Sequence, residues 1–277
     1  MVPNVWWKLV LGNLKSRLIT AAVGIPLLVA LIGWADWWIF AGIFLLITAV
    51  ALREYFRMAF PNRVLEQWYG VAFGLLVSLT VLLPQTADRE LAFTLVLVLT
   101  FSVYLLLRGE LQEKLRGLAW TILGGLYLGL ILPHWVLLFG FQDGRAWVFF
   151  TLIVVMVGDS AAYFGGRYWG RRKLAPVLSP GKTVEGAFAY LGGSIVAAIL
   201  SNALFLRELN PLEAAVLGIC LSVLGQLGDL FESWIKRVFA VKDSGMLLPG
   251  HGGMLDRLDS LIFPAVFTTA YVKVFHS

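Results

Sequence analysis

The feature that most constrains this chain is the recurrence of apolar stretches along its whole length. Each stretch is long enough to cross a bilayer core of roughly 30 Å as a helix. Hydrophobic residues make up 59% of the 277 residues, charged residues only 14%, and the mean hydropathy is +0.82. A water-soluble domain of this composition would expose far too much apolar surface. The sequence therefore predicts an all-α, polytopic integral membrane protein.

Nine transmembrane helices are expected. We place them near residues 18–35, 37–53, 67–84, 90–107, 117–139, 146–165, 184–206, 212–235 and 258–275. Pro133 and His134 fall inside the fifth span, which therefore either ends early or contains a break. We divide the chain into an N-terminal transmembrane region, 1–140, with five helices, and a C-terminal catalytic region, 141–277, with four helices and two active-site loops.

The distribution of Lys and Arg tests this count. All but four of the 22 basic residues lie in the N-terminal tail or in alternate connections between the predicted spans, the exceptions being Arg89, Arg145, Arg207 and Lys273. This bias predicts a cytoplasmic N-terminus and a C-terminus outside. The net charge of +5 reflects the same bias and contact with anionic headgroups. We therefore expect membrane lipids as partners, and no nucleic acid.

Two predicted spans carry an acid shortly before their cytoplasmic ends, Asp159 in the sixth and Asp229 in the eighth. An aspartate facing lipid costs roughly 2.5–3.5 kcal/mol, so we expect both to face each other or a polar cavity. Asp229, Glu232, Ser233 and Lys236 also share one helical face. An intrahelical ladder, Asp229 with Ser233 and Glu232 with Lys236, is the alternative explanation. It does not explain why the polar stripe lies inside an apolar span.

The connection before the last span contains Pro249-Gly-His-Gly-Gly253, followed by Asp256-Arg257-Leu-Asp259. Glycines let the backbone approach a ligand closely and direct N–H groups towards an anion. The two acids are also suited to capping the helix that follows. Capping needs only one of them, so we expect a functional role for this segment.

The acids suit a hard cation such as Mg²⁺, which often links protein carboxylates to substrate phosphates. The single cysteine, Cys220, excludes a cluster of thiol ligands. Asp229 and Asp256 are the leading predicted ligands, followed by Asp159 and Asp259. Phosphates are expected to contact the basic residues of the two loops, Lys182, Arg237, Lys242 and Arg257.

The sixth connection contains Ser179-Pro-Gly-Lys-Thr-Val-Glu-Gly186. This segment differs from a true P-loop because the first glycine is missing at the required spacing and no strand is expected before it. Lys182 is the predicted phosphate contact. Thr183 and Glu185 either contact substrate as well or begin the next helix.

These motifs are those of a known family. Ser233-x-x-Lys236-Arg237, Lys242-Asp243, Pro249-Gly-His-Gly-Gly253 and Asp256-Arg257-x-Asp259 resemble the signature of phosphatidate cytidylyltransferases, or CDP-diacylglycerol synthases. The segments 159–167 and 179–186 resemble two further blocks, and the similarity covers roughly residues 158–260. Gly158 and Gly181 depart from the polar residues that many relatives carry there.

The resemblance implies that CTP and phosphatidic acid react to give CDP-diacylglycerol and pyrophosphate. It also implies Mg²⁺, a potassium ion beside it, a homodimer, and a multi-pass location in the inner (plasma) membrane with the site facing the cytoplasm. The predicted catalytic residues are Asp229, Asp256, Lys236, Arg237, His251 and Asp259. The predicted substrate-binding residues are Ser179, Lys182, Thr183, Glu185, Ser233, Lys242, Asp243, Gly252, Gly253 and Arg257.

Other functions are weighed against this one. A CTP-dependent kinase of polyprenol or a similar lipid alcohol would share the nucleotide and the metal, and a relative acting on ether lipids would share the headgroup chemistry. An ion-coupled transporter would use the intramembrane acids as an ion path. Its polar groups would lie at several depths, whereas here they gather at one, and no pair of spans suggests an inverted repeat.

Overall fold

The computed structural model describes residues 22, 24–84, 86–245 and 252–276. Within these residues, eight helices are long and apolar enough to cross a membrane. They correspond to the second to ninth predicted spans, so the polytopic helical architecture is confirmed. The first predicted span, 18–35, lies partly outside the described residues, and its described part contains a shorter apolar helix, Gly24–Trp34.

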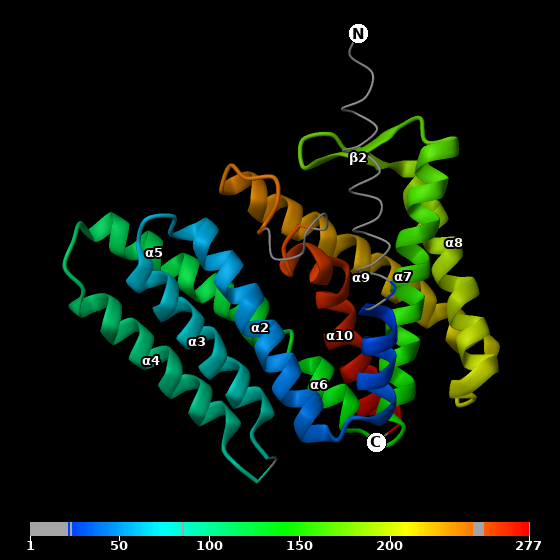
Figure 1. The fold of residues 1–277 in the computed structure, drawn as a ribbon, viewed down its shortest axis with the longest axis horizontal. Helices are drawn as coiled ribbons and strands as arrows, with labels where there is room; N and C mark the ends of the chain where they lie inside the picture. The colour runs from blue at the N-terminus through cyan, green and yellow to red at the C-terminus, as the bar shows by residue number, and fades with distance from the viewer. Residues whose placement is uncertain (1–21, 23, 85, 246–251, 277) are drawn as a thin grey trace.

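The elements follow one another along the chain with short connections (Figure 1). Their bounds are α2 Trp37–Ala59, α3 Val64–Leu82, α4 Arg89–Leu106, α5 Leu111–Gly124, η1 Gly125–Leu130, α6 His134–Phe139, α7 Gly144–Trp169, β1 Lys173–Ala175, β2 Ser179–Thr183, α8 Val184–Ser201, η2 Asn202–Leu206, α9 Pro211–Val238 and α10 Leu255–Phe275.

Several helices begin where a polar side chain caps them. Asp88 accepts a hydrogen bond from the Leu91 N–H at 2.8 Å at the start of α4. Asn210 accepts one from the Glu213 N–H at 2.9 Å, and Pro211 occupies the first turn of α9. Both arrangements satisfy N–H groups that a helix leaves unpaired at its N-terminus.

The fifth span is broken, as its Pro133 suggested. It consists of α5, the π-helical turn η1, a turn through Pro133 and the short helix α6. Proline has no N–H group to continue the helical ladder, so the chain turns there. Gly129 in η1 packs on the backbone of Gly74 in α3, where an added Cβ would lie 2.9 Å from the Gly74 Cα. This close approach requires small residues on both sides.

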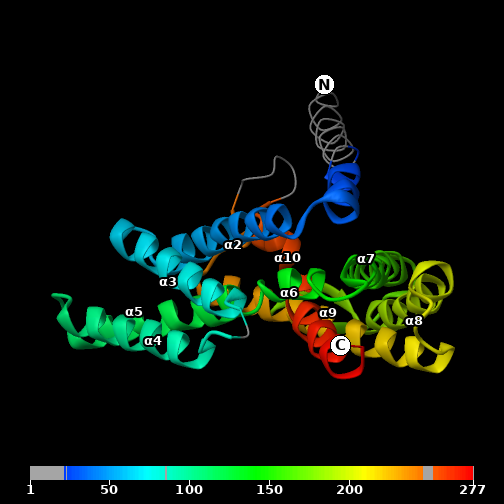
Figure 2. The same ribbon diagram turned by 90° about the horizontal axis from the view of Figure 1, so that it is seen from below.

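The helices form two groups with α10 between them (Figures 1 and 2). One group contains α2 to α5, and the other contains α7, α8 and α9. Large aromatic side chains fill the junction: Phe40 of α2 stacks on Phe139 of α6 at 4.0 Å between ring centroids, and Trp135 and Trp147 are fully buried. The start of α10, the end of α9 and the end of α2 meet at one end of the molecule, where Leu255 donates to Glu54 and Tyr55 packs on Phe239.

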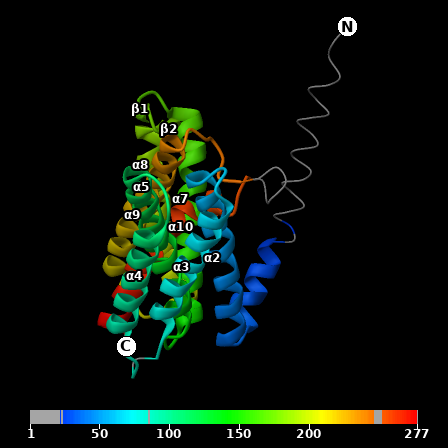
Figure 3. The ribbon, with the colours of Figure 1, turned by 90° about the vertical axis from the view of Figure 1, so that its left-hand side faces the viewer.

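The sixth connection differs from the purely helical expectation because it forms a small antiparallel hairpin of β1 and β2. Lys173 pairs with Thr183, and Ala175 pairs with Ser179. The hairpin lies at the same end of the molecule as the start of α10, opposite the C-terminal end of α10 (Figure 3). It thereby brings Lys182 close to α9.

Candidate functional site

A cavity of about 590 Å³ lies between α7, the hairpin, α8 and α9. Four of the predicted site residues line it: Asp159 from α7, Lys182 and Thr183 from β2, and Asp229 from α9. Gln226 and Tyr190 add polar groups, whereas much of the remaining wall is apolar or glycine. The acids of the sixth and eighth predicted spans therefore face one cavity, as expected.

Lys182 and Asp229 join the two predicted loops directly. The Lys182 Nζ lies 2.6 Å from Asp229 Oδ2, and both side chains are about three-quarters buried. Asp159 Oδ2 accepts a hydrogen bond from Ser260 Oγ at 2.8 Å, which ties α7 to α10. The carboxylate of Asp259 interacts electrostatically with those of Asp159 and Asp229. Three acids therefore lie near one another, and Lys182 pairs with one of them, Asp229.

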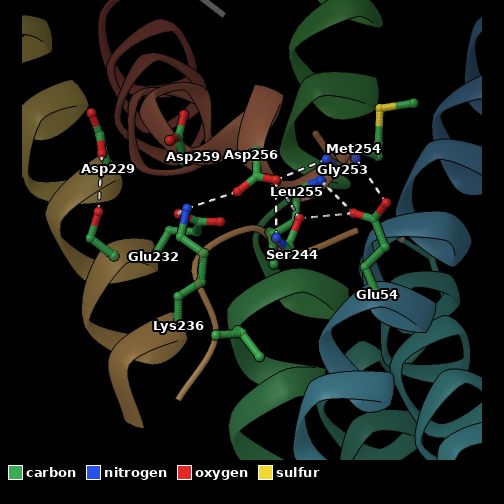
Figure 4. A network of polar contacts seen from close by, with 12 residues as sticks. Glu54, Asp229, Glu232, Lys236, Ser244, Gly253, Met254, Leu255, Asp256 and Asp259 are labelled. Carbon is green, nitrogen blue, oxygen red and sulfur yellow. Dashed lines mark hydrogen bonds and ion pairs between the residues drawn. The ribbon is translucent and has the colours of Figure 1, made fainter. Parts of the chain in front are cut away.

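A second polar network continues from the cavity towards α2 (Figure 4). Lys236 forms ion pairs with the buried Glu232 and with Asp256, where Nζ to Oδ1 measures 2.7 Å. Asp256 Oδ2 accepts hydrogen bonds from the Ser244 N–H, the Ser244 hydroxyl and the Gly253 N–H at 2.8–3.0 Å. Asp256 therefore holds the connection that precedes α10.

The polar stripe on α9 does contain the contacts of an intrahelical ladder. Ser233 Oγ lies 3.5 Å from Asp229 Oδ1, and Glu232 pairs with Lys236. However, Asp229 also reaches Lys182 on the hairpin, and Lys236 also reaches Asp256 on α10. The stripe therefore connects three parts of the chain, which a ladder alone would not do.

The glycines of the connection allow close packing. Gly252 has a φ of +81°, a conformation that other residues rarely adopt, and an added Cβ would lie 2.8 Å from Asp256 Oδ2. An added Cβ at Gly253 would lie 2.5 Å from Glu54 Oε2. His251, predicted as catalytic, lies outside the described residues.

The remaining predicted residues lie on the hairpin, at the start of α8, at the end of α9 and around the connection that follows α9. Arg237 donates from Nε to the Leu178 carbonyl at 3.3 Å, linking α9 to the hairpin. Thr183 caps α8 by accepting from the Gly186 N–H, and Glu185 accepts from the backbone of Arg171 and Arg172. Both shape the hairpin, and their contact with substrate stays a prediction. The same holds for the other members of the set, Ser179, Lys242, Asp243 and Arg257, of which the last three are exposed.

Sequence reasoning missed Glu54. Its carboxylate accepts hydrogen bonds from the Met254 and Leu255 N–H groups at 2.9 and 2.8 Å, and from Ser244 Oγ at 3.2 Å. The second predicted span was ended at residue 53, which left Glu54 in a loop. The segment that follows contains no glycine or proline until Pro61, and α2 continues to Ala59. That uninterrupted helical sequence was the available signal.

The donor set fits a magnesium ion that substrate phosphates help to bind. Asp159, Asp229 and Asp259 supply only hard oxygen ligands. In the described part of the chain, no three Asp, Glu, His or Cys side chains converge closely enough to hold an ion by themselves. Mg²⁺ commonly uses one or two carboxylates together with water and substrate phosphate, so two of these acids would suffice.

Comparisons with known proteins agree with this arrangement. The cytidylyltransferase family is matched by residues 15–275. A phosphatidate cytidylyltransferase of Bacillus subtilis is 35% identical over 241 residues, covering 82% of this chain and 86% of that protein. Those of Staphylococcus haemolyticus and Brucella suis are each 33% identical, covering 90% and 96% of this chain and 95% of either protein.

The match extends well beyond the motif segments near residues 158–260. It includes the N-terminal helices, whose hydrophobic sequence alone carried no family signal, and most of the length of each relative. The chain belongs to the cytidylyltransferase family.

Proposed function

We propose that this protein is a phosphatidate cytidylyltransferase, which transfers CMP from CTP to phosphatidic acid and releases pyrophosphate. The observation that carries the proposal is the cavity between α7, the hairpin and α9, where Asp159, Lys182 and Asp229 meet. It occurs in a chain whose relatives, similar over most of their length, carry this name.

Both basic and apolar residues line the cavity, which supports binding of both substrates. Lys182 is placed to contact phosphate groups of CTP, and Arg167 lines the same cavity, donating to the Tyr163 hydroxyl at 3.0 Å. Leu174, Ala162 and Ala187 supply an apolar wall against which the lipid part of phosphatidic acid can lie. A site at the end of membrane helices lets the lipid enter from the bilayer while the nucleotide enters from water.

The reaction needs no strong base because the lipid phosphate is already an anion at neutral pH. One of its oxygens attacks the α-phosphorus of CTP, and a new P–O bond forms. The bond from the α-phosphorus to the bridging oxygen of the β-phosphate breaks, and pyrophosphate leaves with that electron pair. The main barriers are repulsion between two polyanions and their orientation, which cations and a fixed site lower.

A bound Mg²⁺ would neutralise charge on the triphosphate during this transfer. Asp229 and Asp256 were the leading ligands expected from the sequence. In support of a site in the cavity, Asp159 and Asp229 both line it. Asp256, which accepts hydrogen bonds from Lys236, Ser244 and Gly253, stays a predicted ligand. The potassium ion and the homodimer rest on the family resemblance alone.

We further propose that the protein lies in the plasma membrane with this site facing the cytoplasm. The excess of Lys and Arg on that side supports the orientation, and the relatives named above are bacterial. CTP is available in the cytoplasm, so the orientation also gives the site access to its nucleotide.

Product analysis with labelled CTP tests the function. Purified protein is incubated with Mg²⁺, vesicles that contain both phosphatidic acid and a polyprenol, and CTP labelled either in the cytosine or at the γ-phosphate. We expect the cytosine label in lipid and the γ-label in pyrophosphate. Transfer of the γ-label to a lipid alcohol, with no cytosine in lipid, would identify a CTP-dependent lipid kinase and overturn the proposal.

A further inference from the structure

The carboxylate of Glu54 lies at the end of α2, far in sequence from the catalytic motifs. The residue is only 7% exposed, although it belongs to a helix in the N-terminal half of the chain. Its Oε1 accepts from the Met254 N–H, and its Oε2 accepts from the Leu255 N–H and the Ser244 hydroxyl. All three donors belong to the connection between α9 and α10 or to the first residue of α10 (Figure 4).

Two of these donors are N–H groups that every helix leaves unpaired at its start. The capping residue of α10 is Met254, whose side chain cannot accept a hydrogen bond, and α10 begins at Leu255. Glu54 therefore supplies from another helix the cap that the local sequence lacks. Its negative charge also lies at the positive end of the α10 dipole.

The same connection is held from the opposite side by Asp256. The Ser244 hydroxyl lies between the two acids, 3.2 Å from Glu54 Oε2 and 3.0 Å from Asp256 Oδ2. Tyr55, next to Glu54, packs its ring against Phe239, where α9 ends, at 5.8 Å between centroids. The end of α2 thus contacts both the beginning and the end of the connection.

We propose that Glu54 is a positioning residue of the active site. It fixes the start of α10, and thereby the orientation of Asp256 and Asp259 relative to the cavity that contains Asp159 and Asp229. Glu54 acts through this backbone rather than through substrate. The expected effect on kcat rests on the proposed function. The hydrogen bonds of Glu54 do not depend on it.

The substitutions Glu54→Gln and Glu54→Asp separate this role from simple packing. Glutamine keeps the size, but its NH₂ group cannot accept the hydrogen bond that one of the two backbone donors makes. Aspartate is shorter but keeps two acceptor oxygens. We expect kcat to fall about 100-fold in Glu54→Gln and at most about tenfold in Glu54→Asp. The KM for CTP should change less than about threefold, because substrate contacts remain.

A packing role predicts the reverse order, because glutamine preserves volume and aspartate does not. Glu54→Gln with the wild-type kcat, or with a higher kcat than Glu54→Asp, would overturn the proposal. The matched control is Glu66→Gln, which removes an acid that pairs with Arg63 in the same half of the chain. We expect its kcat to stay within about twofold of the wild-type value.

Hydrogen exchange tests, without substrate, whether Glu54 holds the start of α10. We expect the amides of Met254 and Leu255 to exchange at least about tenfold faster in Glu54→Gln than in the wild-type protein, and at the wild-type rate in Glu66→Gln. Wild-type exchange rates at these two amides in Glu54→Gln would overturn the proposal that Glu54 holds the start of α10. Failure of the wild-type protein to form CDP-diacylglycerol would instead overturn the proposed function, so the two failures are distinguishable.

Ser244→Ala keeps the test available where Glu54→Gln is not recovered as folded protein. It removes one of the three donors to Glu54 and the hydroxyl bond to Asp256. We expect a loss of about tenfold in kcat with little change in the KM for CTP. A wild-type kcat in this variant would contradict the proposal.

Discussion

Two sets of helices, α2 to α5 on one side and α7 to α9 with the central α10 on the other, are both apolar enough to span a membrane, but they use polar residues differently. In the first group, Arg63 and Glu66 form an ion pair at the start of α3, with side chains that are 44% and 17% exposed. In the second, Glu232 and Lys236 pair with side-chain exposures of 0% and 14% inside α9. Lys236 also pairs with Asp256 of α10, so the buried charges of the second group meet across helices as well as within α9.

The contrast indicates a division of labour. Helix α4 is the least buried helix of the first group, because only 11% of its apolar segment is buried inside the protein. In α7, α9 and α10, acids from three helices face one cavity or the network beside it. Glu54 is one of the residues through which the first group contacts the second, together with its neighbour Tyr55. Matched substitutions in the two groups of helices therefore test whether polar side chains matter more in the second group.

Asp229→Asn should have the largest effect. It removes a charge from the cavity and weakens the ion pair with Lys182, so we expect kcat/KM to fall about 10³-fold or more. The control in the first group is Asp88→Asn, because asparagine also caps helices well. Formation of CDP-diacylglycerol by both detergent-purified variants is the measurement. Near-normal activity of Asp229→Asn would remove this residue from the proposed metal site.

Lys236→Met should chiefly affect stability. It leaves Glu232 buried without its ion-pair partner and removes one contact of Asp256. Breaking such a pair by removing one partner costs about 3–5 kcal/mol. Arg63→Met breaks a pair whose side chains are 44% and 17% exposed, so it should cost less than Lys236→Met. Unfolding of both variants in mixed detergent micelles provides the comparison, and equal losses would contradict the difference between the two groups.

Much of the fold could be predicted because the membrane makes hydropathy and charge bias informative. Eight predicted spans correspond to long helices, and the break at Pro133 follows from a missing N–H group. The hairpin β1–β2 was not predicted. Its strands are only three and five residues long, too short for a clear alternation of polar and apolar residues.

The candidate site was predictable where the residues share a helix, as Asp229, Glu232 and Lys236 do on α9. Partners from distant segments were not. Glu54 is separated from Met254 by 200 residues, and no local pattern encodes which backbone N–H groups it accepts from. The hydrogen bonds that Asp256 accepts from Ser244 were equally hidden, because Ser244 lies in a connection with no periodic pattern. Asp256 as a metal ligand stays a prediction.

Lys242→Ala should change substrate binding more than chemistry. Lys242 is exposed in the connection after α9 and belongs to the predicted CTP-binding residues. Loss of one charge-assisted phosphate contact should raise the KM for CTP about tenfold and leave kcat nearly unchanged. Lys114→Ala, an exposed lysine of α5 that donates to the Leu105 carbonyl, is the control. If only the dependence on phosphatidic acid changed, the assignment of Lys242 to CTP would be wrong.

Thr151→Val should have the smallest measurable effect on the free energy of unfolding. The Thr151 hydroxyl in α7 bonds to that of Thr268 in α10 at 3.0 Å, and both residues are buried. Hydrogen bonds between membrane helices contribute about 0.6 kcal/mol on average. Thr94→Val in α4 removes only a bond to the carbonyl of its own helix at Glu90, so we expect almost no change. A larger loss in Thr94→Val, measured by the same unfolding assay, would show that α4 depends on polar contacts as much as the catalytic helices do.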